Sequence, residues 1–137
     1  MRHAKFAALL GFLISLPAAG QIRGPLFAVV PTGFTDSVHV SGLASPVAME
    51  FAPDGRLFVC QKGGALRVIT TAGALLPAPF MTLGVDAANE RGLLGIAFDP
   101  QFASNGWLYC YYTVPGTPAH NRVSRFTASG DLVVPGS

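Results

Sequence analysis

The chain has 137 residues, of which 50% are hydrophobic and 12% are charged, and its formal net charge is +2. A disordered chain combines low hydrophobicity with high net charge, so this composition indicates a globular protein, and its length suits one domain. Arg2 and Lys5 lie among the first five residues, and the remainder has equal numbers of acidic and basic groups. This balance excludes an extended basic surface for nucleic acid.

The first twenty residues have the three parts of a secretory signal peptide. A basic start at Met1–Lys5 is followed by the apolar run Phe6–Leu16 and by the small residues Ala18 and Gly20. At about 1.5 Å per residue, a helix over that apolar run is too short for a hydrocarbon core of roughly 30 Å. We therefore predict a signal peptide over residues 1–20, a secreted or periplasmic protein, and no membrane span.

Short strands separated by turns are predicted for the rest of the chain. Residues 21–42 are expected to form a leader and a first strand, with the strand placed at Asp36–Leu43. Further runs of β-branched and aromatic residues, bounded by Gly or Pro, are typical of strands. They are Pro46–Phe51, Arg56–Gln61, Ala65–Thr71, Gly92–Phe98, Trp107–Val114 and Arg122–Ala128. No window has a sustained helical period, so the predicted fold class is all-β.

One stretch of the chain is repeated. Residues 50–59 (EFAPDGRLFV) match residues 97–110 (AFDP, then NGWLYC), with residues 101–104 inserted in the second copy. A repeat of roughly 45–50 residues with four short strands is the period of a β-propeller blade. Residues 43–137 would then hold the first blade and most of the second, as the N-terminal part of a longer propeller. The alternative is a small secreted β-sandwich.

Three stretches resemble one known family. They are PDGRLFV (53–59), ERGLLGIAFDPQF (90–102), and NGWLYCYY with HNRVSRF (105–112 and 120–126). Together they are similar to the start of the glucose/sorbosone dehydrogenase domain, from about Leu43 onward. The resemblance implies a six-bladed propeller and an exported oxidoreductase. Such an enzyme oxidises an aldose or related polyol with pyrroloquinoline quinone (PQQ) and calcium, and an external acceptor takes the electrons.

The resemblance places few functional residues in this chain. The catalytic His, the basic cofactor contacts and the calcium ligands of quinoprotein members would lie beyond Ser137, and His120 is not equated with that His. Glu90 and Arg91 are the candidates for the substrate pocket. An acid there would bind a polyol hydroxyl or assist proton removal, and the alternative is a structural ion pair. We expect the chain alone to be inactive.

Two further alternatives stay open. The family also includes a non-catalytic extracellular propeller of the hedgehog-interacting type, so a binding module is the second functional hypothesis.

Cys60 and Cys110 are the only cysteines, and export would permit a disulfide between them. In the repeat, Val59 matches Cys110, so the two cysteines have opposite strand parity: they could meet across adjacent blades, or both could point away from each other. The alternative is two small buried hydrophobic residues.

Overall fold

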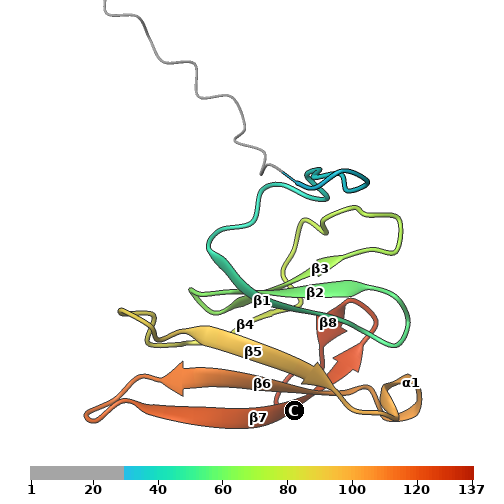
Figure 1. Cartoon of the computed structure of the whole chain (residues 1–137). Helices are drawn as coiled ribbons and strands as arrows, with labels where there is room; N and C mark the ends of the chain where they lie inside the picture. Colours follow the sequence, from blue (N-terminus) through green and yellow to red (C-terminus); the bar gives the residue numbers. More distant parts are fainter. Residues whose placement is uncertain (1–29) are drawn as a thin grey trace, which may run out of the picture. The chain divides into compact units, whose positions relative to one another are not determined.

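The computed structural model describes residues 30–137, so the predicted signal peptide lies outside the described residues. The chain divides into two units, residues 1–37 and 38–137. In the described part of the first unit, the amide of Phe34 donates a hydrogen bond to the carbonyl of Pro31 (3.1 Å). The strands and the helix of the described residues all belong to the second unit (Figure 1).

The second unit consists of two four-stranded antiparallel sheets, each with its strands in chain order. Sheet 1 contains β1 (Pro46–Phe51), β2 (Leu57–Gln61), β3 (Ala65–Ile69) and β4 (Met81–Thr82). Sheet 2 contains β5 (Leu93–Phe98), β6 (Trp107–Val114), β7 (His120–Ser129) and β8 (Leu132–Val133). A single helical turn, α1 (Phe102–Asn105), joins β5 to β6 where the sequence repeat has its insertion. The all-β prediction is confirmed.

The sequence repeat is also a repeat of strand pairing. Equivalent residue pairs occupy both ends of the β1–β2 and β5–β6 ladders. These pairs are Phe51–Leu57 with Phe98–Leu108, and Pro46–Gln61 with Leu93–Tyr112. Each ladder also has one register irregularity at the same place, directly after its first pair. Each sheet is therefore one copy of the same structural unit, as expected for propeller blades.

The predicted strand over Asp36–Leu43 is wrong, because this segment forms no strand and pairs with none of the described strands. Val40 and Leu43 instead pack against a small buried cluster of Leu57, Val59 and Ile69. These three side chains share one face of sheet 1. The apolar residues of the segment thus cover the face of a sheet, and this packing requires no ladder of backbone hydrogen bonds.

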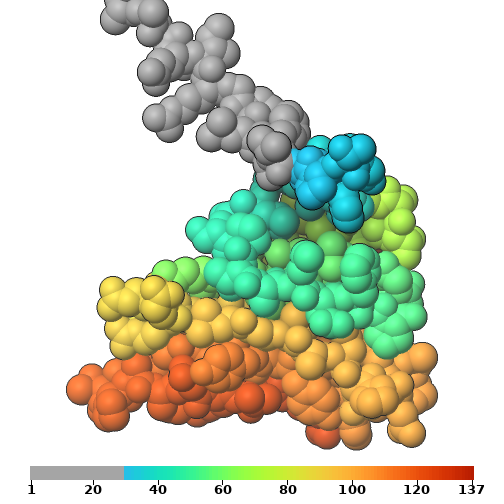
Figure 2. All heavy atoms as spheres, viewed as in Figure 1, coloured from blue at the N-terminus to red at the C-terminus, as the bar shows by residue number. Residues whose placement is uncertain are grey.

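The main core lies between the two sheets. Phe58 of β2 is fully buried, and its ring makes edge-to-face contacts with Phe80 (5.3 Å between centroids) and with Phe98 of β5 (5.0 Å). Such aromatic pairs contribute about 0.5–1.5 kcal/mol beyond the burial of their area. Leu108 of β6 is equally buried in the same cluster. In Figure 2 the atoms of sheet 1 (green) lie directly on those of sheet 2 (yellow to red).

Both cysteines belong to this core, Cys60 from the centre of sheet 1 and Cys110 from the centre of sheet 2. In the structure both thiols are free. The pKa of each thiol is raised to about 12, by burial for Cys60 and by burial together with the neighbouring Cys60 for Cys110. The two residues thus meet on facing surfaces of adjacent blades, where they pack as small apolar side chains.

These thiols are expected to be inert in the folded protein. The thiolate is the nucleophile, and a thiol with a pKa of about 12 is almost wholly protonated at about pH 8. Alkylation with iodoacetamide, followed by mass spectrometry, should leave Cys60 and Cys110 unmodified in buffer and modify both in denaturant. Protection that persists in denaturant and disappears after reduction would instead reveal a disulfide.

Gly64 closes the β2–β3 turn in a conformation that other residues rarely adopt. Its φ is +103°, and a Cβ built on it would lie 2.2 Å from the carbonyl oxygen of Leu83. The neighbouring Gly63 has open space around the same position. We expect Gly64→Ala to lower the free energy of unfolding by about 1–3 kcal/mol, and Gly63→Ala to change it by less than about 0.5 kcal/mol. Urea unfolding of the two variants compares these effects, and equal losses would contradict this account of the turn.

Candidate substrate-binding loop

Glu90 and Arg91 lie at the end of a loop, residues 83–92, that connects β4 to β5; we call it the Glu90 loop. The half-buried Arg91 forms an ion pair with Asp86 (3.2 Å), and its Nε donates to the carbonyl of Ala88 (3.3 Å). The exposed carboxylate of Glu90 makes no hydrogen bond or ion pair with any residue in the range 30–137. Arg91 therefore stabilises the loop, and Glu90 is available to a ligand.

Both sheets hold the Glu90 loop. On one side, the carbonyl of Lys62 in the β2–β3 turn accepts a hydrogen bond from the amide of Leu93 (3.1 Å). On the other side, Thr113 of β6 accepts from the amide of Asp86 (3.0 Å) and donates its own amide to the carbonyl of Gly92 (2.9 Å). The loop consequently spans the seam between the blades, with backbone hydrogen bonds to each.

Gly92 permits this close approach of the two sheets. Its φ is +147°, and a Cβ at this position would lie 2.4 Å from the carbonyl oxygen of Lys62. Any side chain here would push the loop away from sheet 1 and break the hydrogen bond between Leu93 and Lys62. The first glycine of the ERGLLG string is thus explained by a tertiary contact with a turn thirty residues earlier.

A cavity of about 350 Å³ lies beside the Glu90 loop, at the end of the sheets where β1 begins and β2 ends. It is lined by Ala44, Ser45, Gln61, Lys62, Gly63, Ala65 and Ala87. Glu90 is not one of the lining residues. The structure therefore brings the loop and a cavity together at this end of the molecule, with the carboxylate outside the cavity.

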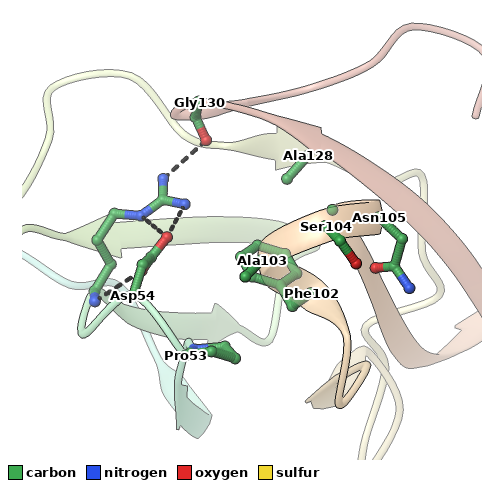
Figure 3. Close-up of a pocket in the computed structure, with 10 residues that line it drawn as sticks. Pro53, Asp54, Phe102, Ala103, Ser104, Asn105, Ala128 and Gly130 are labelled. Atoms are coloured by element: carbon green, nitrogen blue, oxygen red, sulfur yellow. Dashed lines mark hydrogen bonds and ion pairs between the residues drawn. The ribbon is translucent and has the colours of Figure 1, made fainter.

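A larger cavity, of about 460 Å³, occupies the opposite end of the strands, between the β1–β2 turn, α1 and the β7–β8 turn (Figure 3). Its principal charged group, Arg56, is fully engaged by the protein. The guanidinium binds Asp54 (2.6 Å), Asp131 (2.6 Å) and the carbonyl of Gly130 (2.8 Å). We call Arg56, Asp54 and Asp131 the Arg56 clamp. Because it joins a turn of sheet 1 to a turn of sheet 2, its role is structural. Asp54 and Arg56 belong to the PDGRLFV motif, but the motif gives no sign of the contact with Asp131.

The family resemblance implies calcium and PQQ, with their binding residues expected beyond Ser137. Between residues 30 and 137, no three His, Cys, Asp or Glu side chains are grouped so that they could hold a metal ion. A quinone with several carboxylates requires cationic partners. Beside the Glu90 loop, Arg91 pairs with Asp86, whereas Lys62 donates to the carbonyl of Asn89 and has no acidic partner among residues 30–137. His120 lies at the exposed start of β7, where its Nε2 is 3.3 Å from an Arg122 nitrogen.

No helix within residues 30–137 is long and apolar enough to cross a bilayer.

Comparison with known proteins gives the class of the molecule. A model of the Glucose / Sorbosone dehydrogenase family matches residues 43–134, which is more than half of the chain. The chain belongs to this family, and its two sheets are blades of a partial β-propeller.

Individual relatives agree with this assignment. A putative oxidoreductase (glucose dehydrogenase) from Thermus thermophilus is 33% identical with a TM-score of 0.63, over 70% of this chain and 28% of that one. PQQ-bound aldose sugar dehydrogenase from Streptomyces coelicolor is 28% identical with a TM-score of 0.59, over 71% and 30% of the two chains. Hedgehog-interacting protein of Mus musculus is 38% identical over 82 residues, which are 54% of this chain and 12% of that protein. The chain thus spans less than a third of each of these relatives.

The Arg56 clamp predicts a pH dependence of stability. The hydrogen bond from Arg56 lowers the pKa of the Asp54 carboxyl below its ordinary value. The clamp should therefore stabilise the fold above about pH 4, and this contribution is lost as the pH falls through the lowered pKa. Since the Asp54 side chain is 43% exposed, solvent screening limits the effect to less than about 1 kcal/mol.

Denaturant unfolding of wild type and Asp54→Asn at neutral pH and at about pH 2.5 measures this contribution. The two proteins should differ at neutral pH and converge in acid. In an Arg56→Met background, Asp54→Asn should have no further pH-dependent effect, since the partner is already gone. A difference that persists in acid would show that Asp54 stabilises the turn by another route.

Proposed function

We propose that this chain contributes two blades and one substrate contact, Glu90, to an exported sugar dehydrogenase of its family. The whole protein would oxidise an aldose or related polyol, with PQQ as hydride acceptor and an external partner taking the electrons. One observation supports the substrate contact: a carboxylate without a protein partner among the described residues stands at the end of a loop that both blades hold in place. The family's solved structures support the substrate class, because they include glucose and aldose sugar dehydrogenases.

The chemistry of Glu90 suits a polyol. Sugar hydroxyls donate hydrogen bonds, and an ionised carboxylate accepts them from several directions. A hydrogen bond to a charged group is worth about 1.5–3 kcal/mol, and little ordering entropy is lost when the loop is already held. Glu90 would therefore orient the substrate by a hydroxyl group. Arg91 has no direct part in this proposal, since Asp86 already pairs with it.

Calcium and PQQ would be held by other parts of the whole propeller; the PQQ-bound relative is more than three times as long as the region it shares with this chain. The chain alone would then be inactive. The signal-peptide pattern of residues 1–20 supports export to the periplasm or the medium, the compartment proposed for the enzyme.

A non-catalytic binding module is the second candidate function. The identity to Hedgehog-interacting protein, 38% over 82 residues, is higher than the 28–33% found with the solved sugar dehydrogenases. An exposed carboxylate on a rigid loop would equally serve in a protein interface. In that case Glu90 would contact a protein partner, and the whole protein would bind no quinone.

Dye reduction by the whole protein, supplied with PQQ and calcium and offered a panel of aldoses and polyols, tests the enzymatic function. Glu90→Gln should raise KM for the best substrate roughly tenfold or more, as expected for the loss of a charged hydrogen bond. Glu50→Gln is the matched control, because Glu50 is the chain's other glutamate and lies in β1, away from the Glu90 loop. It should leave KM unchanged.

Two results would contradict the proposal. The absence of quinone-dependent activity across the panel, with no PQQ binding detected by calorimetry, would favour the binding module. Full activity with unchanged KM in Glu90→Gln would keep the enzyme but remove Glu90 from its substrate pocket.

A further inference from the structure

We infer that Lys62 of sheet 1 is a positioning residue for Glu90, and that it acts through the Asn89–Glu90 peptide at the start of sheet 2. The role in substrate binding rests on the proposed function, whereas the anchoring itself does not. The evidence is the set of hydrogen bonds that hold the Glu90 loop, and the place of Lys62 within it.

The backbone of Lys62 is held by hydrogen bonds through both its amide and its carbonyl. Its amide donates to the carbonyl of Ser45 (3.0 Å), and its carbonyl accepts from the amide of Leu93 (3.1 Å). Its aliphatic stem lies close to Gly92, since Cγ would be 2.9 Å from a Cβ built there. The ammonium group is thus carried on a stem that both sheets hold.

From this position the ammonium of Lys62 donates a hydrogen bond to the carbonyl of Asn89. Asn89 has a φ of +51°, in the left-handed region that asparagine adopts more readily than most residues other than glycine. The peptide plane between Asn89 and Glu90 is rigid, so holding its carbonyl also fixes the direction in which Glu90 leaves the backbone.

No other hydrogen bond in the described part of the chain reaches Asn89 or Glu90. The other hydrogen bonds of the loop are made by Leu83, Asp86, Ala88, Arg91 and Gly92. Lys62 also has no carboxylate within ion-pair distance among residues 30–137, so its charge is not used to neutralise an acid. Among the described residues, the one hydrogen bond that holds the Asn89–Glu90 peptide therefore comes from the neighbouring blade. The next peptide is held within the loop, because the amide of Arg91 donates to the carbonyl of Ala88 (3.0 Å).

A protease that cleaves after glutamate gives a readout of this anchoring that needs no substrate. This chain has two glutamates, Glu90 in the loop and Glu50 in β1, so cleavage at Glu50 is an internal control. Cleavage of a native protein follows the population of the locally opened form. In the whole protein, Lys62→Met should accelerate cleavage after Glu90 about tenfold and leave cleavage after Glu50 unchanged, with fragments identified by mass spectrometry. Lys62→Arg, which keeps a cationic donor, should restore the wild-type rate.

Kinetics then connect the anchor to the substrate. Lys62→Met should raise KM with little change in kcat, and should have no further effect on KM in a Glu90→Gln background. Unchanged cleavage after Glu90 in Lys62→Met would overturn the inference, as would equal acceleration at both glutamates, which indicates general destabilisation. Accelerated cleavage at Glu90 with unchanged KM in Glu90→Gln would support the anchor and overturn only the substrate role of Glu90.

Discussion

Apolar packing between the two sheets is the interaction on which the rest of this structure depends. Phe58 from sheet 1 and Phe98 from sheet 2 meet edge to face at the centre of the interface. Each sheet buries one face against the other, and burial of a large apolar side chain contributes about 1.5–3 kcal/mol. A four-stranded sheet of this size has no core of its own, so neither blade is expected to be stable without a neighbour.

The features at the two ends of the strands follow from this packing. At one end, the Arg56 clamp joins the turns of the two blades and satisfies its own charges, so the larger cavity there is structural. At the other end, Lys62 and Thr113 hold the Glu90 loop from opposite sheets and leave one carboxylate unpaired among the described residues. A charged group with no partner on a well-held loop is more suited to binding than the larger cavity at the opposite end.

The repeat also explains the exposed apolar side chains of the molecule. Phe51 is 63% exposed on β1, and its equivalent in the repeat, Phe98, packs against Phe58 in the interface between the blades. Val123 is likewise exposed on the outer face of sheet 2. The outer faces thus have the composition of interblade faces, in agreement with a partial propeller. The family's solved members are more than three times as long as the matched region.

Local pattern alone predicted much of this protein: six of the eight strands among the described residues, the turns at Gly55 and Gly64, and the blade repeat. The two-residue strands β4 and β8 were not predicted. These features depend on alternation and on backbone freedom, which short stretches of sequence encode. The segment over Asp36–Leu43 shows the limit of prediction from local pattern. Its alternation of apolar and polar residues suits a strand and a segment packed on a sheet equally well. Only the tertiary structure showed that Arg91 is ion-paired while Glu90 is not. It also placed Cys60 and Cys110 in one core and brought Lys62 to the Asn89 carbonyl. The Asp86–Arg91 ion pair lies within one loop, whereas the other two contacts join different blades and arise only when the two sheets pack.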